Sequence, residues 1–279
     1  MKRILITGKN SYIGTSFEKW LAKYPDKYKV ESISLRDRTW KEKDFSKYDV
    51  VFHVAGIVHR KESNENRDLY FQVNRDLAYE IAKKSKKDRV KQFVFLSTMS
   101  VYGLETGIIT KNTPLKPNNA YGKSKLEAED LIKSLNDESF KVAIIRPPMV
   151  YGKGCKGNYS RLAKLAIKTP IFPDIDNERS MIYIDNLSEF VRLLIENYNN
   201  GLFLPQNKDY VNTSEMVRLI AEIHGKKIIM TKLFNPILKL LNISIVNKVF
   251  GNLVYDKKYS QNKEYQIFSN ELSIKMTED

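Results

Sequence analysis

Short apolar runs alternate along the first half of the chain with segments in which apolar residues recur every three or four positions. The short runs have the length and composition of buried parallel strands: 3–7, 30–35, 51–54, 93–96 and 142–145. The helical spacing occurs in three segments: 13–24, 66–86 and 119–135. Strands that alternate with helices in this way predict an α/β fold built on a doubly wound parallel sheet with right-handed crossovers.

The alternation loosens after Gly152, which indicates a second domain. We expect residues 1–155 to form the larger domain, with 181–199 returning to it, and residues 156–180 and 200–279 to form a smaller lid. The stretch from Leu233 to Val254 is apolar enough for a membrane-surface helix. Because polar residues, a proline and a glycine interrupt it, packing within the lid is favoured.

The composition fits a chain that buries a full core, since 42% of its 279 residues are apolar. The single cysteine, Cys155, excludes an internal disulfide and fits a reducing compartment. The first strand begins at once, which leaves no room for a signal peptide, and no apolar run approaches the ~18 residues of a membrane span. We therefore expect a cytoplasmic protein without a membrane span.

The chain is strongly basic, with a net charge of +14. Such a charge can indicate nucleic-acid binding, but the lysines are scattered and the densest cluster is the short segment 83–87. We expect no nucleic-acid partner. A lysine-rich surface would instead attract a substrate and a cofactor that carry several phosphates.

A turn that runs from Gly8 to Gly14 separates the first strand from the first helix. In a strand–turn–helix unit the backbone can approach a pyrophosphate, which also meets the free N–H groups and the positive dipole of the helix N-terminus. Two glycines six residues apart are weak evidence alone. Their context here predicts a dinucleotide site.

Tyr121 and Lys125 lie four residues apart in a predicted helix, so they share one helix face. An ammonium near a phenol stabilises the phenolate, which would lower the pKa of Tyr121 from about 10 toward neutrality and suit it to proton transfer. The same pattern is typical of an exposed helical pair. Ser97 and Thr98 follow a buried strand, where ligands bind in open α/β sheets. Hydroxyl residues also cap strand ends routinely.

Together these motifs resemble the extended short-chain dehydrogenase/reductases, specifically the nucleotide-sugar epimerase, dehydratase and reductase family. The resemblance runs from about residue 3 to about residue 190. Its motifs occur in the family's order: the turn 7–14, the strand 51–56, Asn74, Thr98 with 101–103, the Tyr121–Lys125 pair and the segment 178–187. Ser11 stands where the family has a middle glycine. The resemblance implies a Rossmann-like domain that binds NAD(P) and a smaller C-terminal lid that binds the substrate.

The resemblance also implies roles for single residues. Thr98, Tyr121 and Lys125 match the catalytic set. The implied cofactor-binding residues are Gly8, Ser11, Tyr12, Ile13, Gly14, Arg36, Arg38, Asp44, Phe45, Val54, Ala55, Gly56, Asn74, Tyr121, Lys125 and Pro148. The implied substrate-binding residues are Thr98, Tyr121, Asn158 and Arg179, with Arg179 holding the diphosphate of a UDP-sugar. No metal ligand is implied.

Two places in the sequence bear on the reaction. Dehydratases of the family carry an Asp-Glu pair after the catalytic threonine, where this chain has Met99 and Ser100, so a dehydratase is not expected. After the second strand, Arg36 and Arg38 suit the 2′-phosphate of NADPH. Asp37 keeps NAD(H) open, because a one-residue shift would present its carboxylate to the ribose.

The cofactor in turn bears on the reaction type, since a reductase consumes a hydride at each turnover and draws on NADPH, whereas an epimerase retains NAD. We therefore expect NADPH-dependent reduction of the 4-keto group of a UDP-linked 6-deoxy-N-acetylhexosamine for surface polysaccharide, as in the bacterial reductases that the chain resembles. An NAD-dependent UDP-sugar 4-epimerase is the first alternative. A non-catalytic nucleotide-binding protein of the same fold is the second.

The family's usual dimer surface corresponds to the helices 66–86 and 119–135, so we expect a homodimer. Their apolar residues are equally suited to the core: Leu77, Ile81, Leu126 and Leu131. Of the histidines, His53 is expected in the core and His59 near the active site.

Overall fold

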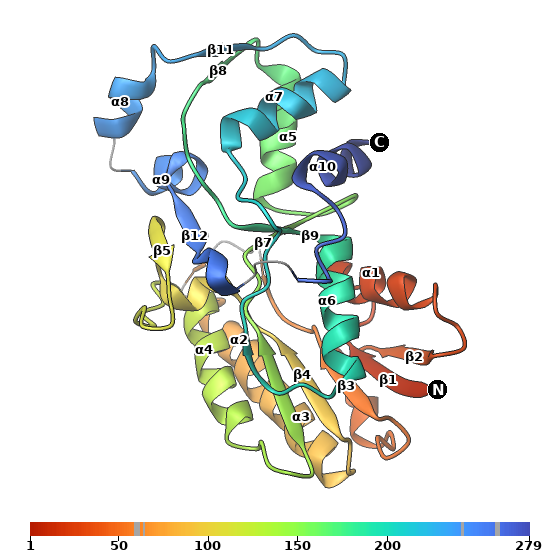
Figure 1. Ribbon diagram of the computed structural model, residues 1–279. Helices are drawn as coiled ribbons and strands as arrows, with labels where there is room; N and C mark the ends of the chain where they lie inside the picture. The colour runs from red at the N-terminus through yellow and green to blue at the C-terminus, as the bar shows by residue number, and fades with distance from the viewer. Residues whose placement is uncertain (59–61, 64, 241–242, 260–262) are drawn as a thin grey trace. The chain divides into compact units, whose positions relative to one another are not determined.

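The protein is described by a computed structural model that covers residues 1–58, 62–63, 65–240, 243–259 and 263–279 (Figure 1). The chain forms two compact units. The first unit comprises Met1–Gly103, Leu115–Pro147 and Ser188–Leu204, and the second comprises Leu104–Pro114, Pro148–Leu187 and Pro205–Asp279. These units differ from the predicted domains at 104–114, 148–155, 181–187 and 200–204. The cofactor-binding and substrate-binding roles of the two domains stay predictions.

A parallel sheet of six strands, in the order β10-β6-β4-β3-β1-β2, is the centre of the first unit. Its strands are β1 (Lys2–Thr7), β2 (Tyr28–Ile33), β3 (Val50–His53), β4 (Gln92–Leu96), β6 (Lys141–Ile145) and β10 (Gly201–Phe203). The chain moves outward from β1 to β2, then returns through β3, β4 and β6 on the other side of β1. This confirms the predicted α/β fold with a doubly wound parallel sheet.

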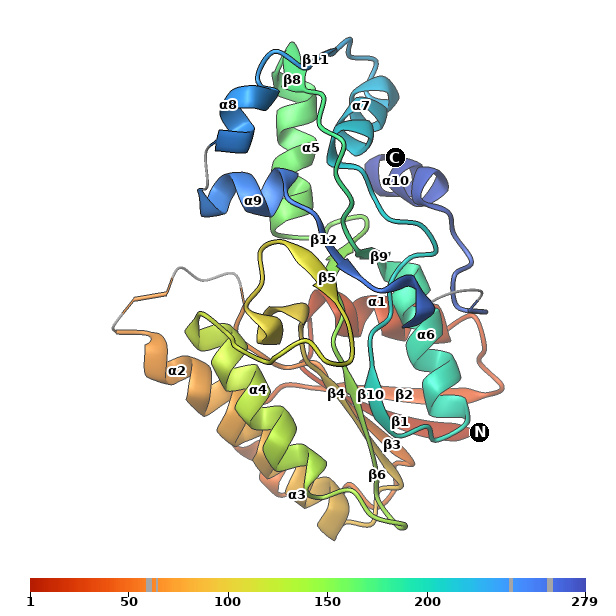
Figure 2. The same ribbon diagram turned by 60° about the vertical axis from the view of Figure 1, so that its left-hand side comes forward.

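Helices cover both faces of this sheet (Figure 2). They are α1 (Tyr12–Leu21), η1 (Thr39–Lys41), α2 (Arg67–Phe71), η2 (Gln72–Leu77), α3 (Ala78–Lys87), η3 (Met99–Tyr102), α4 (Ala120–Lys133) and the larger part of α6 (Ile184–Glu196). Figure 2 shows α2, α3 and α4 on one face, and α1 and α6 on the other. The predicted helix 66–86 is therefore three consecutive segments, because η2 is a π-helical stretch between two α-helices.

Side chains that alternate along the strands form the core of the first unit. On the side of α3 and α4, Phe93 and Phe95 are fully buried together with Ile81 of α3 and Ile132 of α4. The His53 ring stacks against Phe93 and Phe95 of β4, 5.9 Å from each centroid, and is fully buried, which confirms its predicted place in the core.

The second unit contains three two-stranded parallel sheets and several helices. Its strands are β5 (Gly107–Ile109), β7 (Met149–Tyr151), β8 (Ile171–Pro173), β9 (Met181–Tyr183), β11 (Ile229–Thr231) and β12 (Leu253–Tyr255). Its helices are α5 (Asn158–Lys168), α7 (Thr213–Ile223), α8 (Asn235–Leu240), α9 (Ser244–Phe250), η4 (Lys257–Tyr259) and α10 (Asn270–Glu278). The strands pair as β12 with β5, β11 with β8, and β7 with β9.

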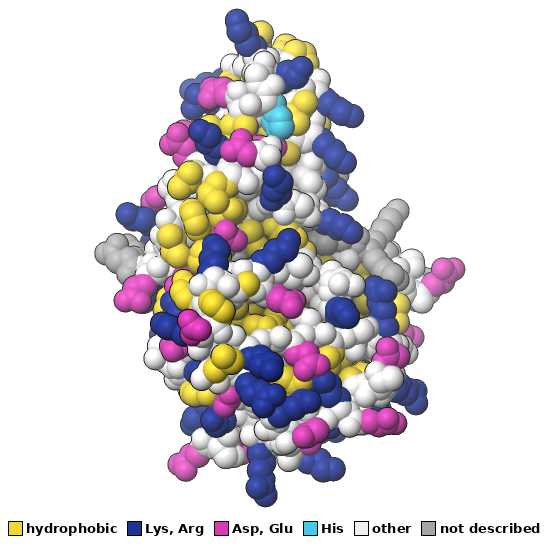
Figure 3. All heavy atoms as spheres, turned by 90° about the vertical axis from the view of Figure 1, so that its right-hand side faces the viewer, with side chains coloured by type: hydrophobic (Ala, Val, Ile, Leu, Met, Phe, Trp, Pro, Cys, Tyr) yellow, Lys and Arg dark blue, Asp and Glu magenta, His cyan; other side chains and the backbone are white. Residues whose placement is uncertain are grey.

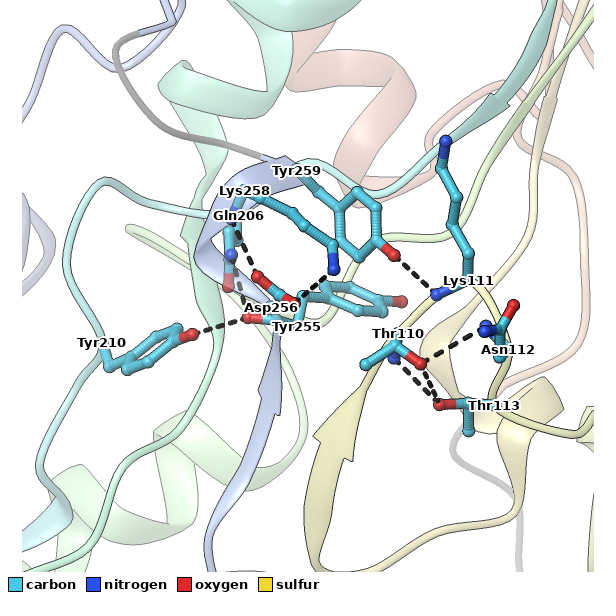
Figure 4. A network of polar contacts seen from close by, with 10 residues as sticks. All are labelled: Thr110, Lys111, Asn112, Thr113, Gln206, Tyr210, Tyr255, Asp256, Lys258 and Tyr259. Carbon is cyan, nitrogen blue, oxygen red and sulfur yellow. Dashed lines mark hydrogen bonds and ion pairs between the residues drawn. The ribbon is translucent and has the colours of Figure 1, made fainter.

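Contacts between distant segments hold this unit together (Figure 4). The Lys111 amide donates to the Tyr259 hydroxyl over 2.5 Å, next to the pairing of β5 with β12. The Tyr210 hydroxyl donates to the Tyr255 carbonyl over 2.7 Å. The segment 104–114 therefore belongs to the second unit, although the first unit surrounds it in sequence.

The apolar stretch from Leu233 to Val254 is divided between α8, α9 and β12, with residues 241 and 242 outside the described part. Leu253 and Val254 are buried, whereas Leu233 is 82% exposed. Within the residues described, no helix is both long and apolar enough to cross a membrane. On the face drawn in Figure 3, lysines and arginines are distributed over both units with acidic side chains among them.

Candidate active site and cofactor site

Thr98, Tyr121 and Lys125 all lie in the first unit, where the end of β4 meets the start of α4. The Asn119 side chain begins α4 by accepting a hydrogen bond from the Gly122 amide over 2.8 Å. Thr98 begins η3, and its hydroxyl accepts from the Ser100 amide over 3.1 Å. The Thr98 side chain also interacts with the Tyr121 phenol. The fold thus brings the three predicted residues together, and their catalytic roles stay predictions.

The pKa of Tyr121 is raised above its ordinary value, because burial disfavours the phenolate more than the interaction with Thr98 favours it. The sequence led us to expect the opposite shift, caused by Lys125. That expectation was wrong for this state of the protein. The Lys125 ammonium instead donates to the Leu96 carbonyl over 2.8 Å and lies 4.7 Å from the centroid of the Phe95 ring.

Lys125 is almost completely buried, at 4% exposure. Burial lowers the pKa of Lys125 to about 8, and the Glu129 carboxylate opposes this shift. The ammonium therefore begins to lose its proton close to physiological pH. Such a shifted group in a set of converging polar side chains is typical of a functional site.

Asn74 lies in the π-helical segment η2, a form of helix that is frequent at functional sites. Its fully buried amide accepts from the Ile57 amide over 2.7 Å and donates to the Ile57 carbonyl over 3.1 Å and to the Ser124 hydroxyl over 3.2 Å. A side chain on Gly56 would come within 2.9 Å of the Asn74 oxygen. Asn74 thus joins the loop after β3 to α4, a link that the sequence did not reveal.

The turn after β1 fits the dinucleotide that the sequence predicts. Gly8 has φ +119°, and a Cβ there would meet the Ala55 amide at 2.8 Å. A Cβ on Gly14 would lie 2.6 Å from the Ser11 hydroxyl oxygen and 3.0 Å from Val54. Only glycine fits at both positions, so bare backbone lies where a pyrophosphate approaches in such folds.

Ser11 differs from the glycine of the family pattern and has a structural task here. Its hydroxyl accepts from the Gly14 amide over 3.2 Å and so caps α1. Tyr12 and Ile13 form the first turn of that helix. The N-terminus of α1 thus begins at the predicted turn, as an anion site on a helix dipole requires.

A cavity of about 300 Å³ lies beyond the end of β2. It is lined by Lys9, Ser32, Ile33, Ser34, Asp37, Thr39, Trp40 and Lys43. Arg36 and Arg38 are exposed and are not among these lining residues. Lys9 and Lys43, which the sequence did not indicate as site residues, line the cavity from two other segments.

Polar contacts already hold the acidic group of this cavity. The Asp37 carboxylate accepts a hydrogen bond from the Thr39 amide over 3.1 Å and another from the Thr39 hydroxyl. Lys43 pairs with Glu31 over 2.6 Å.

Among the other predicted cofactor residues, Phe45 is fully buried and its amide donates to Asp88, while Asp44 is exposed and accepts from the Ser46 amide.

Three predicted site residues belong to the second unit: Pro148, Asn158 and Arg179. Pro148 is buried, and Asn158 is the exposed first residue of α5. The Arg179 guanidinium donates to the Gly251 carbonyl over 2.9 Å and to the Asn247 carbonyl over 3.3 Å. Burial lowers the pKa of Arg179 to about 10. His59 lies outside the described residues.

The family follows from comparison with known proteins. The sequence profile of the "NAD dependent epimerase/dehydratase family" matches residues 4–211. The chain belongs to this family. It is 32% identical over 250 residues to the UDP-glucose 4-epimerase of Vibrio cholerae, and the alignment covers 79% of this chain and 75% of that protein. It is 28% identical to the N-acetyl-alpha-D-glucosaminyl-diphospho-ditrans,octacis-undecaprenol 4-epimerase of Escherichia coli O157:H7, and that alignment covers 85% of this chain and 72% of the relative.

Solved structures agree with this family in their fold. The UDP-glucuronic acid 4-epimerase of Bacillus cereus, solved with NAD, has a TM-score of 0.73 at 20% identity, with 99% and 98% of the two chains covered. The dTDP-4-dehydrorhamnose reductase of Bacillus anthracis str. Ames, solved with NADP, has a TM-score of 0.66 at 20% identity, with coverage of 90% and 99%. The family predicted from the motifs is thus confirmed by the sequence comparisons, and the two structures of similar fold were solved with NAD and with NADP.

Proposed function

We propose that this member of the family is an NADPH-dependent reductase that acts on the 4-keto group of a UDP-linked 6-deoxy-N-acetylhexosamine. The observation that carries the cofactor assignment is the lining of the cavity after β2. Lys9 and Lys43 bring two cations to the place where the fold receives the adenosine ribose. The Asp37 carboxylate also lines this cavity, and Thr39 bonds to only one of its two oxygens, so NAD(H) is the alternative cofactor there.

Thr98, Tyr121 and Lys125 are the groups that we propose for the reduction. NADPH, when bound, supplies a hydride to carbon 4 of the sugar. Tyr121 then donates its proton to the oxygen on that carbon, while Thr98 stabilises the oxygen with a hydrogen bond. Because the pKa of Tyr121 is raised by burial, the phenol is held in the protonated form that this step needs. Lys125 adds a positive charge beside the developing alkoxide.

A 4-epimerase is the second candidate, because both relatives described above carry that activity in their names. The two candidates differ in net chemistry, so one assay separates them. The purified protein is incubated with NADPH and UDP-4-keto-6-deoxy-N-acetylhexosamines, and in parallel with UDP-glucose and UDP-N-acetylglucosamine. Oxidation of NADPH in the first reaction is expected. Formation of the C4 epimers in the second, without NADPH oxidation in the first, would favour the epimerase.

The cofactor assignment predicts a selective loss of NADPH affinity. Removal of a cation from the 2′-phosphate should cost about 1.5–3 kcal/mol, roughly tenfold to a hundredfold in affinity. We expect Lys9→Ala and Lys43→Ala each to weaken the affinity for NADPH by such a factor and to leave the affinity for NADH nearly unchanged, as measured by titration calorimetry. Lys133→Ala, at the exposed end of α4, is the control. Equal losses for both cofactors would instead assign these cations a structural role.

Arg179 is proposed to hold the diphosphate of the sugar nucleotide. Its guanidinium donates to two main-chain carbonyls, and among the described residues it pairs with no carboxylate that a phosphate would need to displace. We expect Arg179→Ala to raise the Michaelis constant for the UDP-sugar about tenfold or more. The Michaelis constant for NADPH should change little. The comparison of both constants in one steady-state series checks this. A rise in the NADPH constant alone would contradict the assignment.

The protein is further proposed to be a cytoplasmic homodimer formed through the segments 66–86 and 119–135, which contain α2, η2, α3 and α4. Ile81 is excluded from such an interface because it is fully buried in the core of its own unit. Leu131 is 36% exposed, and Leu77 and Leu126 are partly buried, so these three residues are the candidates. Light scattering should give twice the chain mass of 32.5 kDa.

A further inference from the structure

A buried ion pair joins α4, the helix of the proposed catalytic residues, to the end of β6. Glu129 lies on α4 and Arg146 follows β6, and they are only 3% and 5% exposed. Arg146 Nε lies 3.0 and 3.1 Å from the two Glu129 carboxylate oxygens, and Nη2 donates to the same carboxylate. Burial alone would lower the pKa of Arg146, but the contact with Glu129 outweighs it and raises that pKa. Arg146 therefore stays protonated.

The same pair holds both ends of the segment that carries Thr98. The Ser97 hydroxyl donates to Glu129 Oε1 directly before Thr98. Arg146 Nη1 donates over 2.9 Å to the hydroxyl of Tyr102, the last residue of the turn that Thr98 begins. The Arg146 guanidinium also lies 5.1 Å from the centre of the Tyr102 ring. A displacement of the ion pair would thus move Thr98 from both sides.

Glu129 also continues the helix face of the catalytic pair. Tyr121, Lys125 and Glu129 follow one another at intervals of four residues on α4. Lys125 bonds to the Leu96 carbonyl and Glu129 to the Ser97 hydroxyl, which are adjacent positions at the end of β4. The face of α4 is therefore fixed residue by residue to the strand end that presents Thr98.

The charges around the Lys125 ammonium come from two elements. On α4, the Glu129 carboxylate favours the protonated amine. On β3, His53 faces Lys125, but burial lowers the pKa of His53 to about 3, so the imidazole is neutral at physiological pH. Tyr121 is held as the neutral phenol. Glu129 is thus the one anion among these described groups that opposes the loss of the Lys125 proton.

We propose that Glu129 and Arg146 are positioning residues for the reaction: they lock Thr98 against the Tyr121–Lys125 face of α4, and the Glu129 carboxylate keeps the Lys125 ammonium protonated. A buried ion pair often contributes no more to stability than a well-packed apolar pair. Its place between both catalytic segments therefore calls for a role beyond stability. The inference rests on the proposed roles of Thr98, Tyr121 and Lys125.

A substitution that removes only the charge tests the inference without substrate or cofactor. In Glu129→Gln the side chain keeps its size and can still accept from Ser97. The matched control is Glu127→Gln on the same helix, whose carboxylate pairs with Arg75 over 2.7 Å and is 47% exposed. The protonation of Lys125 is followed by NMR of the ¹³Cε-labelled lysines, with Lys125→Met for assignment.

We expect the Lys125 titration midpoint to fall by roughly one pH unit in Glu129→Gln and to stay unchanged in Glu127→Gln. An unchanged midpoint in Glu129→Gln would overturn the electrostatic role. If that variant does not fold, the double variant Glu129→Gln/Arg146→Met is titrated instead, since it leaves no unpaired charge. The midpoint is compared with that of Arg146→Met, which differs from the double variant only at Glu129, and equal midpoints would overturn the role there too.

Kinetics give the second readout. The alkaline limb of the kcat/KM profile should move to lower pH in Glu129→Gln by the same amount as the midpoint, with kcat at least about tenfold lower. If Glu129→Gln lost stability while the alkaline limb of its kcat/KM profile stayed at the same pH, the pair would be only structural. If the protein reduced no 4-keto sugar, the proposed function would fail, while the Lys125 titration would still decide the electrostatic inference.

Discussion

Tyr121→Phe is expected to lower kcat by at least about a hundredfold, because it removes the proton donor of the reaction while the ring stays in place. The affinity for NADPH should stay near that of the unchanged protein, since the substitution removes a single hydroxyl. Single-turnover kinetics with excess enzyme measure the chemical step without product release.

The matched control is Tyr79→Phe on α3, which removes a phenol hydroxyl outside the proposed site. We expect its kcat to differ little from that of the unchanged protein. A Tyr121→Phe protein with full activity would remove Tyr121 from its proposed role. If the unchanged protein were itself inactive on every nucleotide sugar but bound dinucleotide, a non-catalytic member of the family would be indicated.

Arg146→Met is expected to destabilise the protein by about 3–5 kcal/mol, because it leaves the Glu129 carboxylate buried without its cation. The ion pair is 6% and 4% exposed at its side chains, so water cannot replace the lost partner without rearrangement. Urea unfolding followed by circular dichroism measures the change in the free energy of unfolding. The comparison is valid where the dependence of this free energy on urea concentration is the same in both proteins.

The double variant Glu129→Gln/Arg146→Met supplies the thermodynamic control. It removes both charges, so most of the lost stability should return, and the coupling between the two sites should be strong. A double-mutant cycle at the surface pair of Arg75 and Glu127 should give a coupling energy of less than about 1 kcal/mol. Additive effects at Glu129 and Arg146 would contradict the account of a tightly coupled buried pair.

The sequence predicted the fold well because the signals of the first unit are local. The apolar runs and the helical spacing placed β4, β6 and α4 to within two residues of their observed bounds. The π-helical turn at Asn74 was not predicted, since no periodicity distinguishes one widened turn inside a helix. The second unit was harder, because its strands are three residues long and pair with distant segments.

The candidate site was predicted in its residues but not in its electrostatics. The spacing placed Tyr121 and Lys125 on one face, but the pKa of Tyr121 depends on burial, which the spacing does not reveal. Glu129 had a signal that was not used: it stands four residues after Lys125 on the same helix face. Lys9 was missed because its approach to the end of β2 depends on tertiary structure.

The most direct test of the proposed reduction follows the hydride itself. The protein is incubated with a UDP-4-keto-6-deoxy-N-acetylhexosamine and NADPH that carries deuterium at both positions of the nicotinamide C4. The account predicts one deuterium at carbon 4 of the sugar for each NADPH oxidised, as measured by mass spectrometry and NMR of the product. Interconversion of C4 epimers of UDP-sugars without net NADPH oxidation and without deuterium in the product would contradict it.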